Sequence, residues 1–286
     1  MEDTNRAIGL LDSGVGGLTV AREIFKLLPE EDIIYYGDTL HLPYGPKDLN
    51  LVREYVVQII NYLVSEKNVK AVVIACNTAT SAALNYVKRK FDIPIFGMIK
   101  SAAAKAVKIS ERQKIAVIGT EGTVNSQAYQ NAILKINKEV DLYAKACPSF
   151  VDLVEQGKFD GPEVKKTARE YLSVLKEAEV DSLILGCTHF PYLTPLLAEI
   201  MGPDVTLINP AHEMAVEVKD TLVEIKLLKK ELTGTAEHRF IVSDLSRISR
   251  QFLEHGRLFL GLEALNFKEE NIFITNKTGR KINNAY

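Results

Sequence analysis

Short apolar runs rich in strand-forming residues alternate with helical patterns along most of the chain. The helical patterns place apolar residues three or four positions apart, as in Leu18, Ala21, Ile24 and Leu28. Apolar strands joined by helices are typical of parallel sheets covered by helices on both faces. The sequence therefore predicts an α/β protein of doubly wound topology. The expected strands cover residues 8–11, 33–36, 72–75, 93–96, 115–119, 140–144, 183–185 and 205–208.

Two segments of the chain recur about 110 residues later. Residues 8–14 resemble residues 115–122, and residues 73–78 resemble residues 183–188. Unrelated parallel α/β segments can also look alike, and this is the alternative reading of the repeat. We predict two pseudo-symmetric doubly wound parallel-sheet domains, with the active site in the cleft between them.

The pattern changes after Pro210. A long helix is expected at residues 211–228, followed by strand-like segments at 240–242 and 272–275 with a short helix between them. This tail has no counterpart in the repeat, so we expect it to return to the first domain and complete it. The first domain is then expected to comprise residues 1–98 and 211–286, and the second domain residues 99–210.

The composition argues against several classes of protein. Lysine and arginine number 35 against 37 aspartate and glutamate, and a net charge of −2 gives no electrostatic basis for binding nucleic acid or an anionic membrane. No apolar run approaches the roughly 18–20 residues of a membrane span, and the first residues lack the pattern of a secretory signal. We therefore expect a cytoplasmic protein with neither nucleic acid nor membrane as a partner.

The chain has three cysteines, Cys76, Cys147 and Cys187. Their odd number argues against a disulfide framework, and none lies at metal-ligand spacing from another cysteine or a histidine. The run Gly14–Gly17 matches a dinucleotide fingerprint only in part, because Thr19 stands at its third glycine position. No lysine lies in a setting that suggests a pyridoxal Schiff base. We expect neither a metal nor a cofactor.

Polar residues gather where strands are expected to end. Ligands bind at the carboxyl ends of the strands in open α/β sheets. The clusters contain no lysine or arginine, so a carboxylate ligand would be held by backbone N–H groups, by hydroxyls and by the Asn77 amide. This set favours a small zwitterion over a polyphosphate. The four clusters are Asp12-Ser13-Gly14-Val15-Gly16-Gly17, Tyr44-Gly45, Cys76-Asn77-Thr78 and Cys187-Thr188-His189.

Cys76 and Cys187 each follow a strand and precede a helix, at equivalent places in the two halves. A helix N-terminus stabilises an anion, which favours a reactive thiol. One cysteine at a strand end is often a packing residue, but two at equivalent places favour a functional pair. Cys147, directly before Pro148, has no such context and is interpreted as structural.

Three further residues are candidate partners of these thiols. Asp12 ends an apolar strand, where a charge is costly unless it is paired or used, and its carboxylate could steady a proton on Cys76. His189 lies two residues after Cys187 and could do the same for that thiol. Glu155 lies in an expected helix, and its sequence context fits a solvated position and a functional one equally.

The clusters resemble the signature motifs of glutamate racemases. The resemblance runs from residue 8 to about residue 216, with four motifs in order at compatible spacing. The segments around Glu155 and Asn209-Pro210 also resemble this family. The motifs are Leu11-Asp12-Ser13-Gly14-Val15-Gly16-Gly17, Pro43-Tyr44-Gly45, Ala75-Cys76-Asn77-Thr78-Ala79 and Gly186-Cys187-Thr188-His189-Phe190-Pro191.

The resemblance implies a cofactor-independent isomerase that interconverts L- and D-glutamate and supplies D-glutamate for bacterial peptidoglycan. It implies that Cys76, helped by Asp12, deprotonates the D-enantiomer, and that Cys187, helped by His189, deprotonates the L-enantiomer. It also implies a homodimer. The residues implied to line the substrate are Asp12, Ser13, Tyr44, Gly45, Asn77, Thr78, Thr188 and His189.

Three other functions stay open at this point. An aspartate or hydantoin racemase would share the fold and the thiols. A cysteine hydrolase would use Cys187 as nucleophile and His189 as base, although residues two apart rarely reach the alignment that such pairs need. A non-catalytic amino-acid-binding protein would also place two lobes around a cleft. In the racemase reading, the two sulfurs flank one carbon and should lie roughly 7 Å apart.

Overall fold

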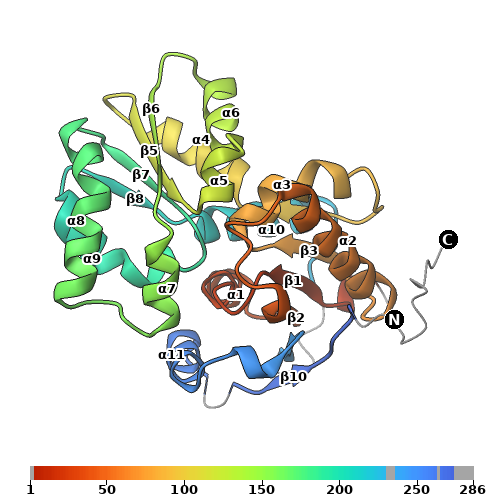
Figure 1. The fold of residues 1–286 in the computed structure, drawn as a ribbon. Coiled ribbons are helices and arrows are strands. Elements are labelled where there is room, and N and C mark those ends of the chain that lie inside the picture. The colour runs from red at the N-terminus through yellow and green to blue at the C-terminus, as the bar shows by residue number, and fades with distance from the viewer. Residues whose placement is uncertain (1–2, 230–235, 263–264, 274–286) are drawn as a thin grey trace.

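The computed structural model describes residues 3–229, 236–262 and 265–273, and these form two α/β lobes (Figure 1). Every pair of neighbouring strands in both lobes is parallel. The first lobe is built on a six-stranded sheet of order β10-β9-β2-β1-β3-β4, and the second on a four-stranded sheet of order β6-β5-β7-β8. The predicted fold class, two parallel-sheet α/β domains, is confirmed.

Apart from β10, the strands fall where the apolar runs predict them, with ends that differ by one or two residues, as is usual for such boundaries. In the first lobe they are β1 (Ile8–Asp12), β2 (Ile33–Gly37), β3 (Ala71–Ile74), β4 (Ile95–Gly97), β9 (His238–Val242) and β10 (Phe267–Glu269). In the second lobe they are β5 (Lys114–Gly119), β6 (Asp141–Ala146), β7 (Ser182–Gly186) and β8 (Thr206–Ile208).

The two sheets share one topology. In the first, β2-β1-β3-β4 lie side by side, and in the second β6-β5-β7-β8 do so. If the strands of each half are counted along the chain, their order across the sheet is therefore the same in both halves: second, first, third, fourth. Cys76 follows the third strand of the first half and Cys187 the third strand of the second half. The repeat seen in the sequence is thus a repeat of topology, which places both thiols at equivalent strand ends.

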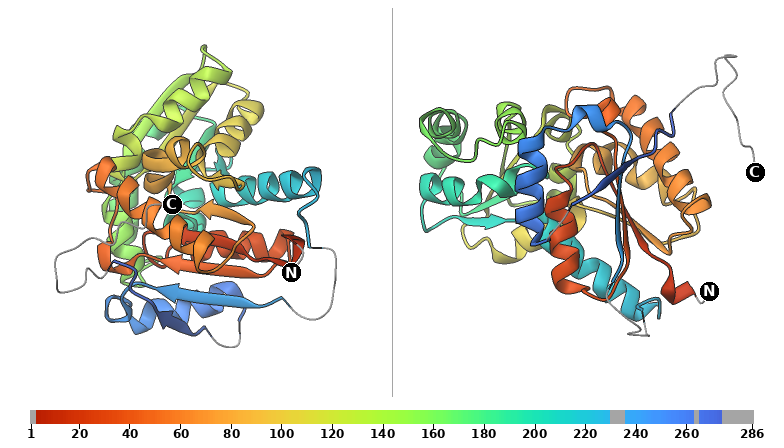
Figure 2. Two further views of the ribbon diagram at one scale, coloured as in Figure 1. Left: turned by 90° about the vertical axis from the view of Figure 1, so that its right-hand side faces the viewer. Right: turned by 90° about the horizontal axis from the view of Figure 1, so that it is seen from below.

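Helices cover both faces of each sheet (Figures 1 and 2). In the first lobe α2 and α3 pack on one face, while α1, α10 and α11 lie on the other. In the second lobe α4 and α6 pack on one face, and α8 and α9 on the other. The bounds are α1 (Leu18–Leu27), α2 (Leu49–Ser65), α3 (Asn77–Val87), α4 (Ile99–Ile109), α5 (Glu121–Asn125), α6 (Ala128–Ile136), α7 (Ser149–Glu155), α8 (Pro162–Glu177), α9 (Thr194–Met201), α10 (Pro210–Glu224) and α11 (Arg250–Leu260). Short 3₁₀ helices are η1 (Asp3–Asn5), η2 (Thr39–His41), η3 (Phe190–Leu193) and η4 (Leu245–Arg247).

The C-terminal segment returns to the first lobe, as expected, because β9 pairs with β2 and β10 with β9. The domain boundaries at residues 98–99 and 210–211 stay a prediction. The expected strand at 272–275 was wrong: β10 is formed earlier, where Phe267 packs against the rings of Tyr35 and Phe240. Residues 272 and 273 form a turn, and residues 274–275 lie outside the described part of the chain. The long helix α10 ends at Glu224 rather than at 228, because Lys226 adopts a left-handed backbone conformation (φ 58°).

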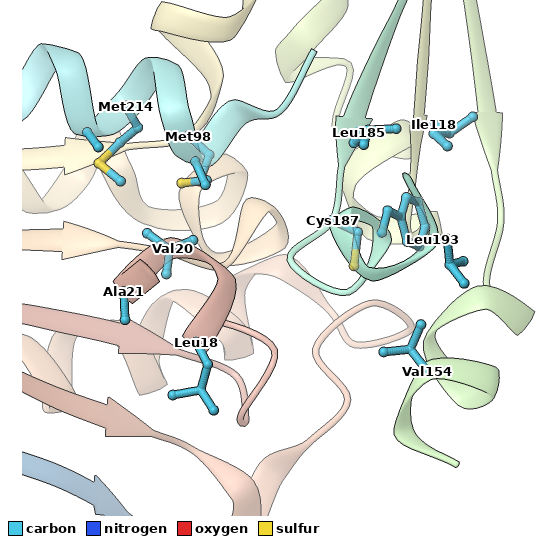
Figure 3. Close-up of a cluster of buried hydrophobic side chains, with 14 of the residues drawn as sticks. Leu18, Val20, Ala21, Met98, Ile118, Val154, Leu185, Cys187, Leu193 and Met214 are labelled. Atoms are coloured by element: carbon cyan, nitrogen blue, oxygen red, sulfur yellow. The ribbon is translucent and has the colours of Figure 1, made fainter. Parts of the chain in front are cut away.

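One apolar cluster continues from the first lobe into the second. Figure 3 shows Leu18 and Val20 on one side of Cys187, and Leu193 and Val154 on its other side. The helix α10 packs against α1 in the first lobe and against α4 in the second, and so it also joins the two lobes. Burial of this shared cluster fixes the ends of the two sheets relative to each other. Within the described residues, no helix combines the length and the apolar character needed to span a bilayer.

Gly37, the last residue of β2, lies against the loop that follows β1. A Cβ atom here would collide with the carbonyl oxygen of Gly14 in the loop after β1. We expect Gly37→Ala to lower the free energy of unfolding by about 1–3 kcal/mol, because backbone on both sides must shift. Urea unfolding followed by circular dichroism measures this loss.

Gly9→Ala in the adjacent strand is the matched control. Its Cβ would meet the Leu63 side chain at 3.2 Å, and a flexible side chain can give way. A loss for Gly37→Ala no larger than that for Gly9→Ala would contradict the steric argument.

Candidate functional site

A cavity of about 160 Å³ lies between the lobes, at the carboxyl ends of both sheets. The first lobe contributes Ser13, Leu42, Pro43, Tyr44, Gly45, Pro46, Cys76, Asn77 and Thr78. The second lobe contributes Thr120, Glu121, Pro148, Val151, Asp152, Gly186, Cys187, Thr188 and His189. None of the described residues that line it is a lysine or an arginine. All four polar clusters that the sequence singled out therefore meet at one place.

Cys76 is the N-cap residue of α3. Its sulfur accepts the backbone N–H of Ala79 at 3.4 Å, and the residue is only 7% exposed. Burial is the main reason that the pKa of this thiol rises to about 12, and the nearby charge of Asp12 contributes to the same rise. Desolvation thus outweighs the helix N-terminus, and Cys76 holds its proton at neutral pH.

Asp12 is fully buried at the end of β1 and is near enough to Cys76 for its charge to affect the pKa of that thiol. Its Oδ2 accepts the N–H groups of Gly14 and Gly17, at 3.1 and 3.0 Å. Its Oδ1 is buried and has no hydrogen-bond partner among the described residues. Burial raises the pKa of this carboxyl group, although His189 and the N–H donors oppose the shift. Asp12 can therefore hold or accept a proton within reach of the site.

The glycines after β1 make room for this arrangement. A Cβ on Gly17 would lie 2.6 Å from the Cβ of Asp12, and a Cβ on Gly16 would lie 2.5 Å from the His189 ring. The loop therefore wraps a carboxylate and packs against an imidazole. These contacts account for the glycine run without a bound pyrophosphate.

Cys187, His189 and Glu155 form a chain of contacts. The Cys187 sulfur lies 3.7 Å from His189 Nδ1, and His189 Nε2 lies 2.6 Å from Glu155 Oε1. Burial alone would lower the pKa of His189, but its bonds to Cys187 and Glu155 outweigh burial and raise the pKa well above its usual value. The protonated imidazole can donate to the sulfur and to the carboxylate together.

The expectation that residues two apart rarely align was wrong for Cys187 and His189. A tight turn, closed by the Phe190 N–H on the Cys187 carbonyl at 3.1 Å, brings both side chains to the same side. The structure also shows the partner of Glu155, whose role the sequence left open: it contacts His189. These two residues lie 34 positions apart in the chain.

The Tyr44-Gly45 loop is held from two directions. The Tyr44 hydroxyl donates to Asp38 at 2.6 Å, and Asp38 also accepts from Ser243 of the C-terminal segment at 3.0 Å. On the other side, the Gly45 carbonyl accepts the N–H of Gly122 in the second lobe at 2.8 Å. The C-terminal segment thus supports a loop that lines the cavity.

Hydroxyl and amide groups join the lobes around the cavity. Thr78 Oγ1 lies 2.8 Å from Thr120 Oγ1 and 3.1 Å from Thr123 Oγ1. Thr19 donates its hydroxyl to the Thr188 carbonyl at 2.9 Å. These contacts bridge α3 to the turn before α5, and α1 to the turn after β7. They hold the lobes together at the cavity.

Several residues of this site were not predicted from the sequence. Thr120 carried an available signal, since it directly follows the strand that the repeat pairs with β1. Asp152 and Val151 gave no signal, because they lie on the short helix α7 and face the cavity only through tertiary packing. Cys147 is fully buried and lies outside the cavity lining. Among the residues that the structure describes, no three His, Cys, Asp or Glu side chains come together as a metal site.

Comparison with known proteins gives consistent similarities. The sequence model of the Asp/Glu/hydantoin racemase family matches residues 9–218. A glutamate racemase from Geobacter metallireducens is 44% identical over 256 residues, covering 90% of this chain and 93% of the relative. One from Listeria innocua is 43% identical over 243 residues, covering 85% and 91%.

Solved structures give the same picture. The crystal structure of glutamate racemase isoform RacE1 from Bacillus anthracis superposes with a TM-score of 0.87 at 35% identity, covering 93% of this chain and 98% of that one. The structure of glutamate racemase from Francisella tularensis in complex with D-glutamate gives 0.85 at 35% identity, covering 94% and 99%.

The contacts of the three thiols predict unequal reactivity. With iodoacetamide at neutral pH, we expect Cys187 to be alkylated about tenfold faster than Cys76, because only Cys187 lies beside a protonated imidazole. Cys147 should react slowest, since burial raises its pKa to about 12 and it lies away from the cavity. Peptide mass spectrometry over time gives the three rates. Faster labelling of Cys76 than of Cys187 would contradict this assignment.

Proposed function

The chain belongs to the Asp/Glu/hydantoin racemase family, and from this premise we propose that it interconverts L- and D-glutamate with two thiols and without a cofactor. The product D-glutamate would supply bacterial peptidoglycan. The cytoplasmic location and the homodimer that the resemblance implies stay predictions.

One observation carries the proposal: each lobe presents one cysteine, from an equivalent strand end, to the same cavity. Racemisation needs a base on one face of the α-carbon and an acid on the other. Two pseudo-symmetric halves provide such a pair without any need to turn the substrate over. Relatives named glutamate racemase support glutamate as the substrate.

Starting from the L-enantiomer, the two thiols act in sequence. Cys187, beside the His189 imidazolium, takes the α-proton as the Cα–H bond breaks. Cys76, which holds its proton, then delivers that proton to the opposite face, and a new Cα–H bond forms. The reverse reaction starts with the proton on Cys187 and the charge on Cys76. Asp12 assists proton transfer at Cys76, and the His189–Glu155 pair assists it at Cys187.

The carbanion formed between these steps needs stabilisation, because an α-proton is only weakly acidic. Backbone N–H groups at the start of α3, the Asn77 amide and the Thr78 and Thr188 hydroxyls surround the cavity. Fixed dipoles in a site closed to water stabilise developing charge strongly. The interlobe contacts provide the closure, and we expect opening for substrate entry to hinge near Ile99 and Pro210.

Proton exchange tests this function directly. Incubated with L-glutamate in ²H₂O, the protein should replace the α-proton with deuterium, seen by NMR, while circular dichroism falls to zero. Aspartate should turn over far more slowly. Faster turnover of aspartate would favour the sister racemase, and saturable binding without exchange would favour a binding protein. An acyl-enzyme trapped in mass spectrometry would favour the hydrolase.

Removing either thiol of the pair should abolish racemisation. We expect Cys76→Ala and Cys187→Ala to lower kcat/KM at least about a thousandfold, because one face of the carbon then lacks an acid–base group. Each variant should still eliminate a leaving group from a β-substituted substrate that uses the remaining thiol. Cys147→Ala is the matched control and should stay active. Full racemase activity in either cavity variant would exclude the two-thiol mechanism.

Loss of the Glu155 charge should change the pH dependence. The Glu155 carboxylate helps to raise the pKa of His189, so Glu155→Gln lowers that pKa. The imidazolium is then lost at lower pH, and the alkaline limb of kcat/KM should move down by about one pH unit. Glu163→Gln, which removes an exposed carboxylate paired with Lys158, is the control. An unmoved alkaline limb in Glu155→Gln would show that this pair does not set the protonation of His189.

A further inference from the structure

One buried tyrosine contacts both thiol-bearing turns. Tyr129, on α6 of the second lobe, is fully buried, and its hydroxyl donates to Asn77 Oδ1 in the first lobe at 2.7 Å. Its ring lies against Gly186, where an added Cβ would come within 3.2 Å of Tyr129 Cε2. Asn77 directly follows Cys76, and Gly186 directly precedes Cys187. The side chain therefore spans the distance between the two turns.

The Tyr129 hydroxyl decides which way the Asn77 amide faces. Asn77 is 3% exposed and lines the cavity, and its Nδ2 is buried with no acceptor among the described residues. If the amide were reversed, Nδ2 would donate to the phenol oxygen, but the phenol proton would lose its acceptor. A buried O–H donor without an acceptor is costly. Burial also raises the pKa of Tyr129 well above its usual value, so the phenol keeps the proton that it donates.

We propose that Tyr129 is a positioning residue, which turns the Asn77 amide so that Nδ2 donates to a carboxylate of the bound amino acid. This inference rests on the proposed function. Because none of the described lining residues is a lysine or an arginine, each neutral donor contributes a large share of anion binding. A reversed amide would instead place an oxygen against the anion.

The contact between Tyr129 and Asn77 also makes the orientation of the Asn77 amide depend on closure of the lobes. Tyr129 and Asn77 belong to different lobes, and their hydrogen bond joins residues 52 positions apart. When the lobes separate, the amide loses the group that orients it. Asn77 is therefore held as a donor in the closed state, where the two thiols flank the substrate.

The test is Tyr129→Phe, which keeps the ring and removes the hydroxyl. We expect KM for both enantiomers to rise about tenfold, the size of one lost hydrogen bond to a charged group, with kcat changed less than about threefold. Since the enantiomers have equal free energy, kcat/KM must fall equally in both directions, which checks the assay. Tyr36→Phe is the matched control: this buried tyrosine donates to the Glu270 carbonyl, and its loss should leave KM unchanged.

A double-mutant cycle separates positioning from packing. In an Asn77→Ala background, Tyr129→Phe should change kcat/KM less than about twofold, because the amide it orients is already gone. Asn77→Asp, which places an oxygen where Nδ2 stood, should raise KM at least as much as Tyr129→Phe. It provides a second test that holds even where Tyr129→Phe is poorly folded.

The outcomes distinguish this inference from the proposed function. If the unmodified protein exchanges no α-proton of glutamate, the proposed function fails first. If it racemises glutamate but Tyr129→Phe, folded by its melting temperature, keeps an unchanged KM, the positioning role is wrong. Equal fold losses for Tyr129→Phe with and without Asn77 would also overturn it, and so would an unchanged KM in Asn77→Asp.

Discussion

Burial of polar groups where two parallel sheets end is the constraint on which the site depends. The cavity lining offers neither lysine nor arginine among its described residues, so charge on Asp12, Cys76 or His189 is governed by desolvation and a few fixed partners. Desolvation keeps the proton on Cys76, whereas Glu155 and Cys187 keep one on His189. In such a buried setting an unpaired polar group is costly. For the same reason, each N–H or hydroxyl donor there interacts strongly with a charged ligand.

The two halves repeat in topology but differ in the neighbours of their thiols. The first strand of one half ends at Asp12, whereas the equivalent strand of the other half is followed by Thr120. Cys76 therefore faces a buried carboxyl group, and Cys187 faces an imidazole. A reaction that removes a proton on one face and returns one on the other needs an acid–base group at a similar position on each face, and the proposed function assigns the two thiols to these roles.

Close contact between the lobes depends on small residues and hydroxyl groups. Gly16 lets the first loop reach His189, and Gly45 leaves space for Thr120. The Thr78 and Tyr129 hydroxyls then bridge lobes whose apolar cluster is already continuous beneath them. Packing sets the distance between the sheets, and the polar contacts above it set the orientation of individual donors.

The sequence by itself determined the two parallel sheets and placed both thiols at strand ends, because apolar runs, helical periodicity and the repeat are local patterns. It also identified the clusters around Asp12 and His189. Only the tertiary structure decided that Glu155 meets His189 and that Tyr129 meets Asn77, since these contacts join residues 34 and 52 positions apart. It also placed the last strand at β10, through ring packing around Phe267. Such pairings depend on how helices pack across a sheet, and no local pattern encodes that.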